Sequence, residues 1–478
     1  MHVESSSATH SAATRQLESA LERIGVTPAH RTMVILVMLG VMFDVFEQNA
    51  VGLIGPILRE DWKIGTGEIG FLNTLTFFAA AIGRLGSGLL ADRFGRRLML
   101  NANLLMFTLG ATICALAPDY TVLAAGRFLV GLGLGGEIVT AVTLLSEFCS
   151  SRFRGTAVGL INVGGGGFGN MLAPALAIGV FAVFTGPERW RWLFAVLVLP
   201  ALLVMFFRRY VPETPRYLVA RGRVDEANSV LSRLQSGSFA RKDAPATAFI
   251  SGGAVPFEGG FLRTIREVFS GALLPRTLCV GTASWMTFGA QLTVLSLMPT
   301  ILVAQGHSIT KSYLYTIVLQ SGSLLGALAA ALLASRVPRK KVLTAASICA
   351  VLAGLGFGFL ARTDVLILLF GALFQFFVLL CNTSIWIFAP EQYPTRVRGF
   401  GTSFILALGT MAGAWTPLLA GRLFDSAGLA GMFSLMAGMY LVFAIVIQFV
   451  PETFGRSMEA QDDTPAAPAA AAHSPAGG

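Results

Sequence analysis

Residues 91–97 read Ala-Asp-Arg-Phe-Gly-Arg-Arg, and a related stretch, Ala-Ser-Arg-Val-Pro-Arg-Lys, occupies residues 334–340. The two stretches lie about half the chain apart, and each follows an apolar segment rich in small residues. The second copy has lost the acid that stands at Asp92 in the first. Repetition at one displacement indicates a duplicated structural unit, so the sequence predicts two homologous halves.

Two further pairs of segments recur at nearly the same displacement. Residues 147–155 share their Glu, Arg, Arg and Gly positions with residues 391–399, and the Val-Pro-Glu-Thr at 211–214 returns at 450–453. Each member follows or precedes an apolar segment in the same way in both halves. Chance similarity is therefore a poor explanation for the three pairs, whereas a duplicated six-helix unit explains all of them.

The composition indicates that lipid surrounds this duplicated unit. The chain has 478 residues, of which 54% are hydrophobic and only 13% are charged, and its mean hydropathy is +0.69. Apolar stretches of about 20 residues, long enough to cross a bilayer, recur along it, and we count about twelve. Helices satisfy their own backbone groups in lipid. The sequence therefore predicts an all-α membrane protein with twelve transmembrane helices in two pseudo-symmetric six-helix bundles.

The apolar and polar segments divide the chain into five parts. We expect a cytoplasmic N-terminal segment at 1–32, an N-terminal bundle at 33–207, a cytoplasmic linker loop at 208–273, a C-terminal bundle at 274–450 and a cytoplasmic, largely disordered tail at 451–478. The first apolar run begins after a polar stretch and contains two acids, which argues against a cleaved signal peptide.

The charges indicate topology rather than nucleic-acid binding. The net charge is +9, but most of the 35 Lys and Arg fall in segments that this topology leaves in the cytoplasm, as expected for an inner-membrane protein with both termini inside. The five cysteines fall within predicted helices or in a cytoplasmic loop, so we expect no disulfide. The sequence also shows no spacing of residues that is typical of a metal site. The polar segments contain neither a nucleophile with its base nor a nucleotide loop, so we do not expect an enzyme.

Two longer motifs stand in the first half of the chain. Residues 88–97 read Gly-Leu-Leu-Ala-Asp-Arg-Phe-Gly-Arg-Arg, and residues 127–137 read Arg-Phe-Leu-Val-Gly-Leu-Gly-Leu-Gly-Gly-Glu. The first resembles the loop motif between the second and third helices of the major facilitator superfamily, and the second resembles the fourth-helix motif of that superfamily. The similarity covers residues 30 to 458. The Pro-Glu-Thr segments resemble the sugar-porter and synaptic-vesicle-protein-like branches, whereas residues 43–58 resemble the first helix of aromatic acid and niacin-type proton symporters. The resemblance implies the major facilitator fold.

Three charged residues within the predicted first and fourth helices are candidates for proton coupling. Asp44 and Glu47 stand three residues apart, so both project from one helix face, where an unpaired charge costs at least about 2.5 kcal/mol. Arg127 lies at a similar depth to Glu47 if the two helices are neighbours. An acid paired with Arg that opens during transport can take up a proton. A permanent structural ion pair is the alternative.

Polar and aromatic residues inside the helices are candidates for binding the solute, because transporter sites form between the repeats near mid-membrane. The candidates are Gln48, Arg84, Asn162, Asn170, Trp285, Gln291, Asn382 and Trp386. Helix-to-helix contacts explain any one of them as well. Arg84 and Glu137 lie at similar depths, so they either form a structural ion pair or leave Arg84 free to attract an anionic solute.

The resemblance also implies that the cytoplasmic motifs act as conformational latches. This set comprises Gly88, Asp92, Arg93, Gly95, Arg96, Arg97, Glu137, Glu147, Arg154, Glu213, Arg216, Glu391, Arg398 and Glu452. A simpler alternative is that the basic residues only set the topology.

Together these observations predict a secondary active transporter, a proton-coupled symporter of a small organic acid, aromatic or niacin-like, that works by alternating access. A sugar-porter-like transporter and a drug or metabolite efflux pump are alternatives, and a non-transporting receptor or regulator is the alternative from another class. We expect a monomer in the lipid bilayer that binds a small molecule and protons and no nucleic acid, and that draws energy from the proton gradient with no cofactor or metal.

Overall fold

The computed structural model describes residues 13, 15–199, 210–240, 247–251, 261–334, 336–394 and 397–454, apart from the side chains at 66, 92, 151, 152 and 261–263. These residues form helices and connecting turns, with no strand among them. The first half contains α2 (Pro28–Trp62), α3 (Thr66–Phe94), α4 (Arg96–Leu116), α5 (Tyr120–Phe148), α6 (Ser151–Asn162), the π-helix η1 (Val163–Gly169), α7 (Asn170–Val183) and α8 (Arg189–Val196).

The second half repeats this pattern after a helical connection. The connection contains α10 (Pro215–Ala220), α11 (Val224–Gln235) and α12 (Phe261–Val268). The second half consists of α13 (Leu273–Ala304), α14 (Ile309–Leu333), α15 (Arg339–Leu360), α16 (Asp364–Glu391), α17 (Arg398–Val446) and the short 3₁₀-helix η2 (Ile447–Phe449).

The helices agree with twelve membrane crossings. Ten helical segments among the described residues are long and apolar enough to span a bilayer, with α6, η1 and α7 forming one of them. The segment that contains α17 is two helices, because Gly428 interrupts it with φ 62° and ψ −154°, a conformation that glycine adopts without a steric penalty. At the place of the predicted sixth helix the structure describes α8, and residues 200–209 lie outside the described residues.

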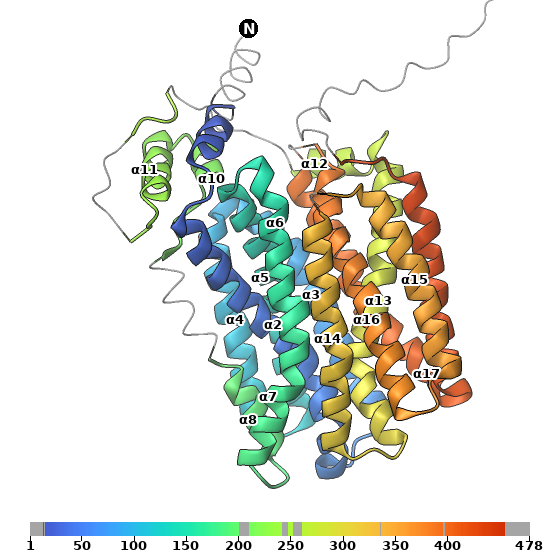
Figure 1. Cartoon of the computed structure of the whole chain (residues 1–478). Coiled ribbons are helices and arrows are strands. Elements are labelled where there is room, and N and C mark those ends of the chain that lie inside the picture. The colour runs from blue at the N-terminus through green and yellow to red at the C-terminus, as the bar shows by residue number, and fades with distance from the viewer. Residues whose placement is uncertain are drawn as a thin grey trace, which may run out of the picture.

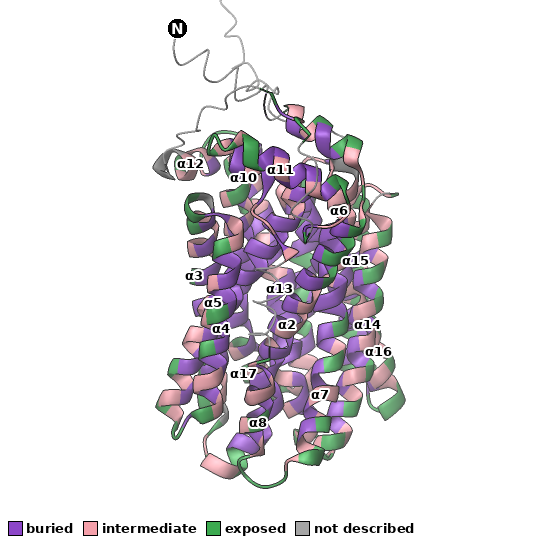
Figure 2. Ribbon diagram, turned by 90° about the vertical axis from the view of Figure 1, so that its left-hand side faces the viewer, coloured by how far each residue is buried: buried purple, intermediate pink, exposed green. Residues whose placement is uncertain are grey.

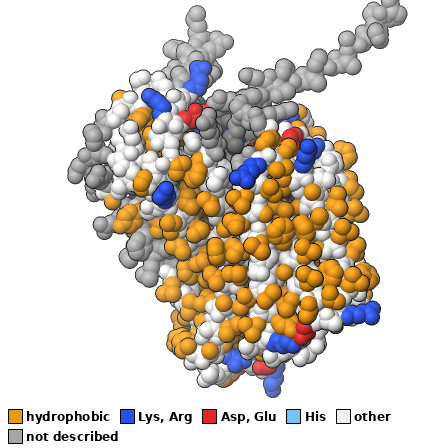
Figure 3. All heavy atoms as spheres, viewed as in Figure 1, with side chains coloured by type: hydrophobic (Ala, Val, Ile, Leu, Met, Phe, Trp, Pro, Cys, Tyr) orange, Lys and Arg blue, Asp and Glu red, His pale blue; other side chains and the backbone are white. Residues whose placement is uncertain are grey.

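The two halves stand side by side as bundles. Figure 1 shows the helices from α2 to α8 on one side and those from α13 to α17 on the other, with α10, α11 and α12 gathered at one end. Hydrophobic side chains cover the face seen in Figure 3, and Lys and Arg concentrate near its two ends. Buried residues fill the interior of the bundles in Figure 2. Such an apolar belt suits contact with lipid tails.

Glycines in the fourth-helix motif let α5 pack closely between two neighbours. A methyl group at Gly135 would overlap the backbone of Ala80 in α3, and one at Gly133 would overlap the backbone of Phe107 in α4. Small residues permit this close approach of helices in a membrane. The motif therefore has a packing role that holds α3, α4 and α5 together.

Two segment boundaries differ from the sequence prediction. The first bundle helix begins at Pro28 rather than at residue 33, because Pro28 takes the first helical position after Thr27, where the fixed φ of proline favours a helix start. The linker between the bundles contains helices rather than only loop, because α11 buries apolar residues such as Leu231 and Leu234. Residues 455–478 of the predicted tail lie outside the described residues.

Candidate functional site

A cavity lies between the two bundles, with about 480 Å³ of space free of protein atoms when open solvent is included. Helices α2, α3, α5 and α6 and the π-helix η1 line it from the first bundle, and α13 and α16 line it from the second. Six predicted solute-binding residues line this cavity: Gln48, Arg84, Asn162, Gln291, Asn382 and Trp386. Both repeats therefore contribute to one site, as expected for a solute bound between them.

The other two predicted solute-binding residues do not line this cavity. Asn170 is fully buried, accepts a hydrogen bond from Asn49 at 3.2 Å and donates one to the carbonyl of Gly166 at 2.8 Å. Asn170 therefore holds the π-helix η1 against α2. Trp285, in α13, is half-buried outside the cavity lining.

Arg84 is the cationic side chain of the cavity. It comes from α3, is 3% exposed, and donates a hydrogen bond from Nη1 to the carbonyl of Leu406 in the second bundle at 3.1 Å. Its guanidinium lies over the rings of Phe288 and Trp386, 5.8 Å from each ring centre. Cation–π contact and the bond to Leu406 hold the arginine in place, while its Nε has no hydrogen-bond partner among the described residues.

Of the two alternatives for Arg84 and Glu137, the structural ion pair is not formed among the described residues. Arg84 points to the second bundle, and the carboxyl group of Glu137 instead lies beside that of Asp44. Equal depth in the membrane did not determine which way each side chain points around its helix.

A second charged group lies behind the cavity, where Arg127 forms an ion pair with Glu47. The exposed fractions of these side chains are 1% and 0%. Arg127 also donates from Nε to the hydroxyl of Thr76 at 3.1 Å and from Nη2 to the backbone carbonyl of Glu47 at 3.4 Å. Neither Glu47 nor Arg127 lines the cavity, whereas Gln48, next to Glu47 in α2, does. In this conformation the pair is closed and shielded from water.

The family model described as sugar (and other) transporter matches residues 32–464. The chain belongs to this family of transporters. It is 31% identical to the niacin transporter NiaP of Acinetobacter baylyi over 93% of this chain and 99% of that protein. It is 29% identical to a probable 4-methylmuconolactone transporter of Cupriavidus pinatubonensis over 90% of this chain and 94% of that protein.

Solved structures agree on the fold. The proton:xylose symporter XylE bound to 6-bromo-6-deoxy-D-glucose matches with a TM-score of 0.73 and 18% identity, over 90% of this chain and 98% of that one. The predicted twelve-helix major facilitator fold is confirmed, and the protein is a multi-pass membrane transporter rather than an enzyme.

In this transporter, the loop motif of the first bundle forms a compact network at the end of the bundle where α10 lies (Figure 1). Arg96 forms an ion pair with Glu147 at 3.1 Å and donates to the carbonyl of Ala91 at 3.1 Å. Glu147 also accepts a hydrogen bond from Thr214 at 2.5 Å, and Glu213 accepts one from the backbone of Arg96 at 3.0 Å. The loop, α5 and the segment before α10 are thereby joined within one bundle.

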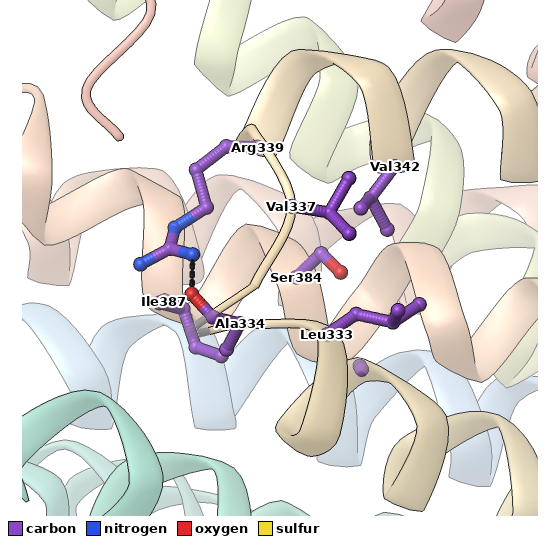
Figure 4. Close-up of a pocket in the computed structure, with 8 residues that line it drawn as sticks. Leu333, Ala334, Val337, Arg339, Val342, Ser384 and Ile387 are labelled. Atoms are coloured by element: carbon purple, nitrogen blue, oxygen red, sulfur yellow. Dashed lines mark hydrogen bonds between the residues drawn. The ribbon is translucent and has the colours of Figure 1, made fainter. Parts of the chain in front are cut away.

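The second bundle of the transporter repeats this network. Arg339 forms an ion pair with Glu391 at 3.1 Å, and Glu391 accepts from Thr453 at 2.5 Å. Glu452 accepts from the backbone of Arg339 at 3.1 Å. Figure 4 shows Arg339 folding back to the carbonyl of Ala334, above a small apolar pocket. The sequence repeat is thus a repeat of hydrogen bonds, one set in each bundle.

The remaining predicted latch residues have varied surroundings. Gly95 adopts φ 99°, which favours glycine, and Arg93 stacks on Phe94. Arg216 forms an ion pair with Glu18 at 2.9 Å. The backbone N–H of Arg97 donates a hydrogen bond to Glu213. The side chain of Arg154 donates to the carbonyl of Ser146, and that of Arg398 donates to the carbonyl of Tyr393. Gly88 lies close to Ser403 of the second bundle. The side chain of Asp92 lies outside the described part of the structure.

Sequence reasoning missed the direct contacts between the bundles of this transporter. The hydroxyl of Tyr313 donates to the carbonyl of Leu53 at 2.5 Å, and Asn162 donates to the hydroxyl of Thr383 at 2.6 Å. Tyr313 and Thr383 were detectable as polar groups inside apolar helices, but their partners lie hundreds of residues away in sequence. Only the packing of the bundles brings them together.

Proposed function

We propose that this protein is a proton-coupled symporter of a small organic acid that carries a ring and one carboxylate. Three unpaired hydrogen-bond donors around the cavity carry this proposal: Nε of Arg84, Nδ2 of Asn382 and Nε1 of Trp386. All three atoms are shielded from solvent and lack a partner among the described residues. A buried donor without an acceptor costs about 1–3 kcal/mol, so the site favours a ligand that brings acceptor atoms. With the charge of Arg84, a carboxylate is the best match.

The rest of the cavity wall suits a ring. Val41, Val45, Ile138, Phe288 and Leu292 supply apolar surface beside the three donors. Small-molecule sites commonly combine a mostly apolar wall with a few placed polar groups. The niacin transporter NiaP, a full-length relative, is named for a pyridine carboxylic acid, which has these two parts. That relationship supports the proposed substrate class.

A sugar is the second candidate substrate. Four carboxamide side chains line the cavity, those of Gln48, Asn162, Gln291 and Asn382, and the family model is named for sugar transport. Carboxamides hydrogen-bond hydroxyl groups in either direction. A sugar, however, brings no charged acceptor to Arg84 and so forms no charge-assisted hydrogen bond with it, which makes the carboxylate the stronger candidate.

Proton coupling is assigned to the buried acids of the first bundle. Glu47 is held by Arg127 in the conformation described, and a neutral, protonated Glu47 would release this arginine. On this assignment, the two bundles alternate in giving the site access to either side of the membrane. The proton gradient supplies the energy, and no cofactor takes part. We place the protein as a monomer in the inner membrane with both termini in the cytoplasm.

Ligand-induced stabilisation of the purified protein tests the substrate class. We expect nicotinate and benzoate to raise Tm in a concentration-dependent manner, whereas xylose and glucose leave it unchanged. Counterflow of radiolabelled nicotinate in proteoliposomes then tests turnover, and its absence despite binding would favour a receptor. Stabilisation by sugars alone would replace the proposed substrate by the second candidate.

A further inference from the structure

Asp44 of α2 and Glu137 of α5 bring two carboxyl groups together inside the first bundle. Their residues are 0% and 1% exposed, and their carboxyl groups lie side by side. Neither oxygen of Asp44, nor Oε2 of Glu137, has a geometrically well-formed hydrogen bond to another described residue. Burying a hydrogen-bond acceptor without a donor is energetically costly, so these carboxyl oxygens need a hydrogen-bond donor between them. A proton between the two carboxyl groups supplies it.

The charged groups facing this pair come from three helices. Arg84 of α3 is the cation that acts on Asp44, and Glu47 of α2 adds a further negative charge to its surroundings. Glu47 is itself neutralised by Arg127 of α5. Two adjacent carboxylates shielded from water do not both stay ionised, because their repulsion and burial favour the protonation of one. One shared proton leaves a single negative charge, which Arg84 balances.

Arg84 therefore serves two partners. Its positive charge attracts the negative charge of the Asp44–Glu137 pair, and the same side chain lines the cavity. If an anionic ligand takes the positive charge of Arg84, the negative charge on the acid pair loses its balance. A second proton bound by the pair restores neutrality.

We propose that the Asp44–Glu137 pair is the proton site linked to the solute, and that it takes up one proton when a carboxylate binds at Arg84. This inference rests on the proposed function, because it requires a carboxylate in the cavity. The proton comes from water and forms one O–H bond on the acid pair, while the ligand remains ionised. Linkage is reciprocal, so protonation of the pair also tightens carboxylate binding. The ion pair of Glu47 and Arg127 stays closed during this step.

Proton uptake on binding tests the proposal with the full chain. Purified protein in weakly buffered detergent solution is mixed with nicotinate, and the pH change is read with an indicator dye beside the amount of ligand bound. Nicotinamide, which keeps the pyridine ring but has no carboxylate, is the matched ligand. We expect about one proton taken up per nicotinate and none per nicotinamide. Binding of nicotinate without proton uptake would overturn the inference and leave the proposed function standing.

Two variants locate the proton. Glu137→Gln and Asp44→Asn should each bind nicotinate with proton uptake reduced at least about five-fold, whereas Asp225→Asn, an exposed acid of α11, should match the wild type. Uptake at the wild-type level in either folded variant places the proton elsewhere and refutes the assignment. If the variants do not fold, the comparison of nicotinate with nicotinamide on the wild type still decides whether a linked proton exists. Failure of nicotinate and benzoate to bind at all refutes both proposals.

Discussion

Arg127 of α5 reaches across the first bundle to the carboxylate of Glu47 in α2, and solvent reaches almost none of either side chain. The arginine is fixed further by Thr76 of α3 and stacks over the ring of Phe194 at 5.8 Å. Four helices, α2, α3, α5 and α8, therefore meet at one buried ion pair. Opening such a pair is costly unless the acid becomes neutral, so protonation of Glu47 and movement of these helices are expected to occur together.

The first prediction concerns the variant Glu47→Gln, which imitates a permanently protonated Glu47. We expect it to retain exchange of labelled for unlabelled nicotinate and to lose accumulation driven by a pH gradient, because the empty carrier can no longer close the ion pair and return. Counterflow and gradient-driven uptake in the same proteoliposomes measure the two activities. Asp225→Asn, on the exposed face of α11, is the control. Undiminished accumulation would remove Glu47 from the coupling mechanism.

The second prediction concerns the charge of the cavity. Arg84→Gln should weaken nicotinate binding about 10- to 150-fold, because a charge-assisted hydrogen bond contributes about 1.5–3 kcal/mol. Nicotinamide binding should change much less, since it makes no ion pair. Isothermal titration of both ligands checks the difference. Equal losses for the two ligands would mean that Arg84 supports the structure of the cavity and does not recognise the carboxylate.

Trp386 offers a milder version of the same test. Trp386→Phe keeps an aromatic ring beside Arg84 but removes the unpaired Nε1 donor. The expected loss in nicotinate affinity is about 2- to 13-fold, the effect of one hydrogen bond of about 0.5–1.5 kcal/mol. An unchanged affinity would show that this donor faces away from the ligand.

Much of the architecture was predictable from sequence, because apolar length and internal repetition depend only on local composition. The two halves and the twelve crossings followed from these signals. The closeness of Glu47 and Arg127 was predictable from depth along two helices. Depth failed for Arg84 and Glu137, because the rise per residue fixes height in the membrane but not the direction of a side chain around the helix axis. That direction depends on how neighbouring helices pack.

For the site, too, one part was predictable from the sequence and another part was not. Polar residues inside apolar helices are costly, so Gln291, Asn382 and Trp386 were detectable as candidates without a structure. Their free donor atoms were not detectable, because a donor is unpaired only with respect to neighbours in space. Asn170 is an example: it is also a polar residue inside an apolar helix, but its side chain accepts a hydrogen bond from Asn49 and does not line the cavity.

The third prediction is a pH dependence of the Glu452 network in the second bundle. Burial alone would raise the pKa of Glu452, but hydrogen bonds from the backbone N–H groups of Lys340, Phe454, Thr453 and Arg339 outweigh it and leave this pKa below its usual value. A lowered pKa means that the ionised carboxylate stabilises the folded state above the unfolded pKa of about 4.3, and that this stabilisation is lost as pH falls through the folded value.

Comparison of Glu452→Gln with the wild type by thermal unfolding checks this effect. The variant should have a lower Tm at pH 7, and the gap should shrink as the pH approaches about 4. Glu226→Gln, which removes an exposed ion pair with Arg223, should change stability by less than about 1 kcal/mol at either pH. A gap that is the same at both pH values would show that the charge of Glu452 does not contribute.

The fourth prediction tests the packing role of the glycines in α5. Gly135→Ala places a methyl group against the backbone of Ala80, which cannot move without separating α3 from α5, so we expect a loss of about 1–3 kcal/mol and a lower Tm. Gly438→Ala in α17 is the matched control, because a methyl group there meets no atom within 4 Å. That change should leave Tm unchanged or raise it slightly, since alanine favours a helix over glycine by about 1 kcal/mol. Equal effects of the two substitutions would mean that helix propensity, and not close contact between α3 and α5, explains the glycine at position 135.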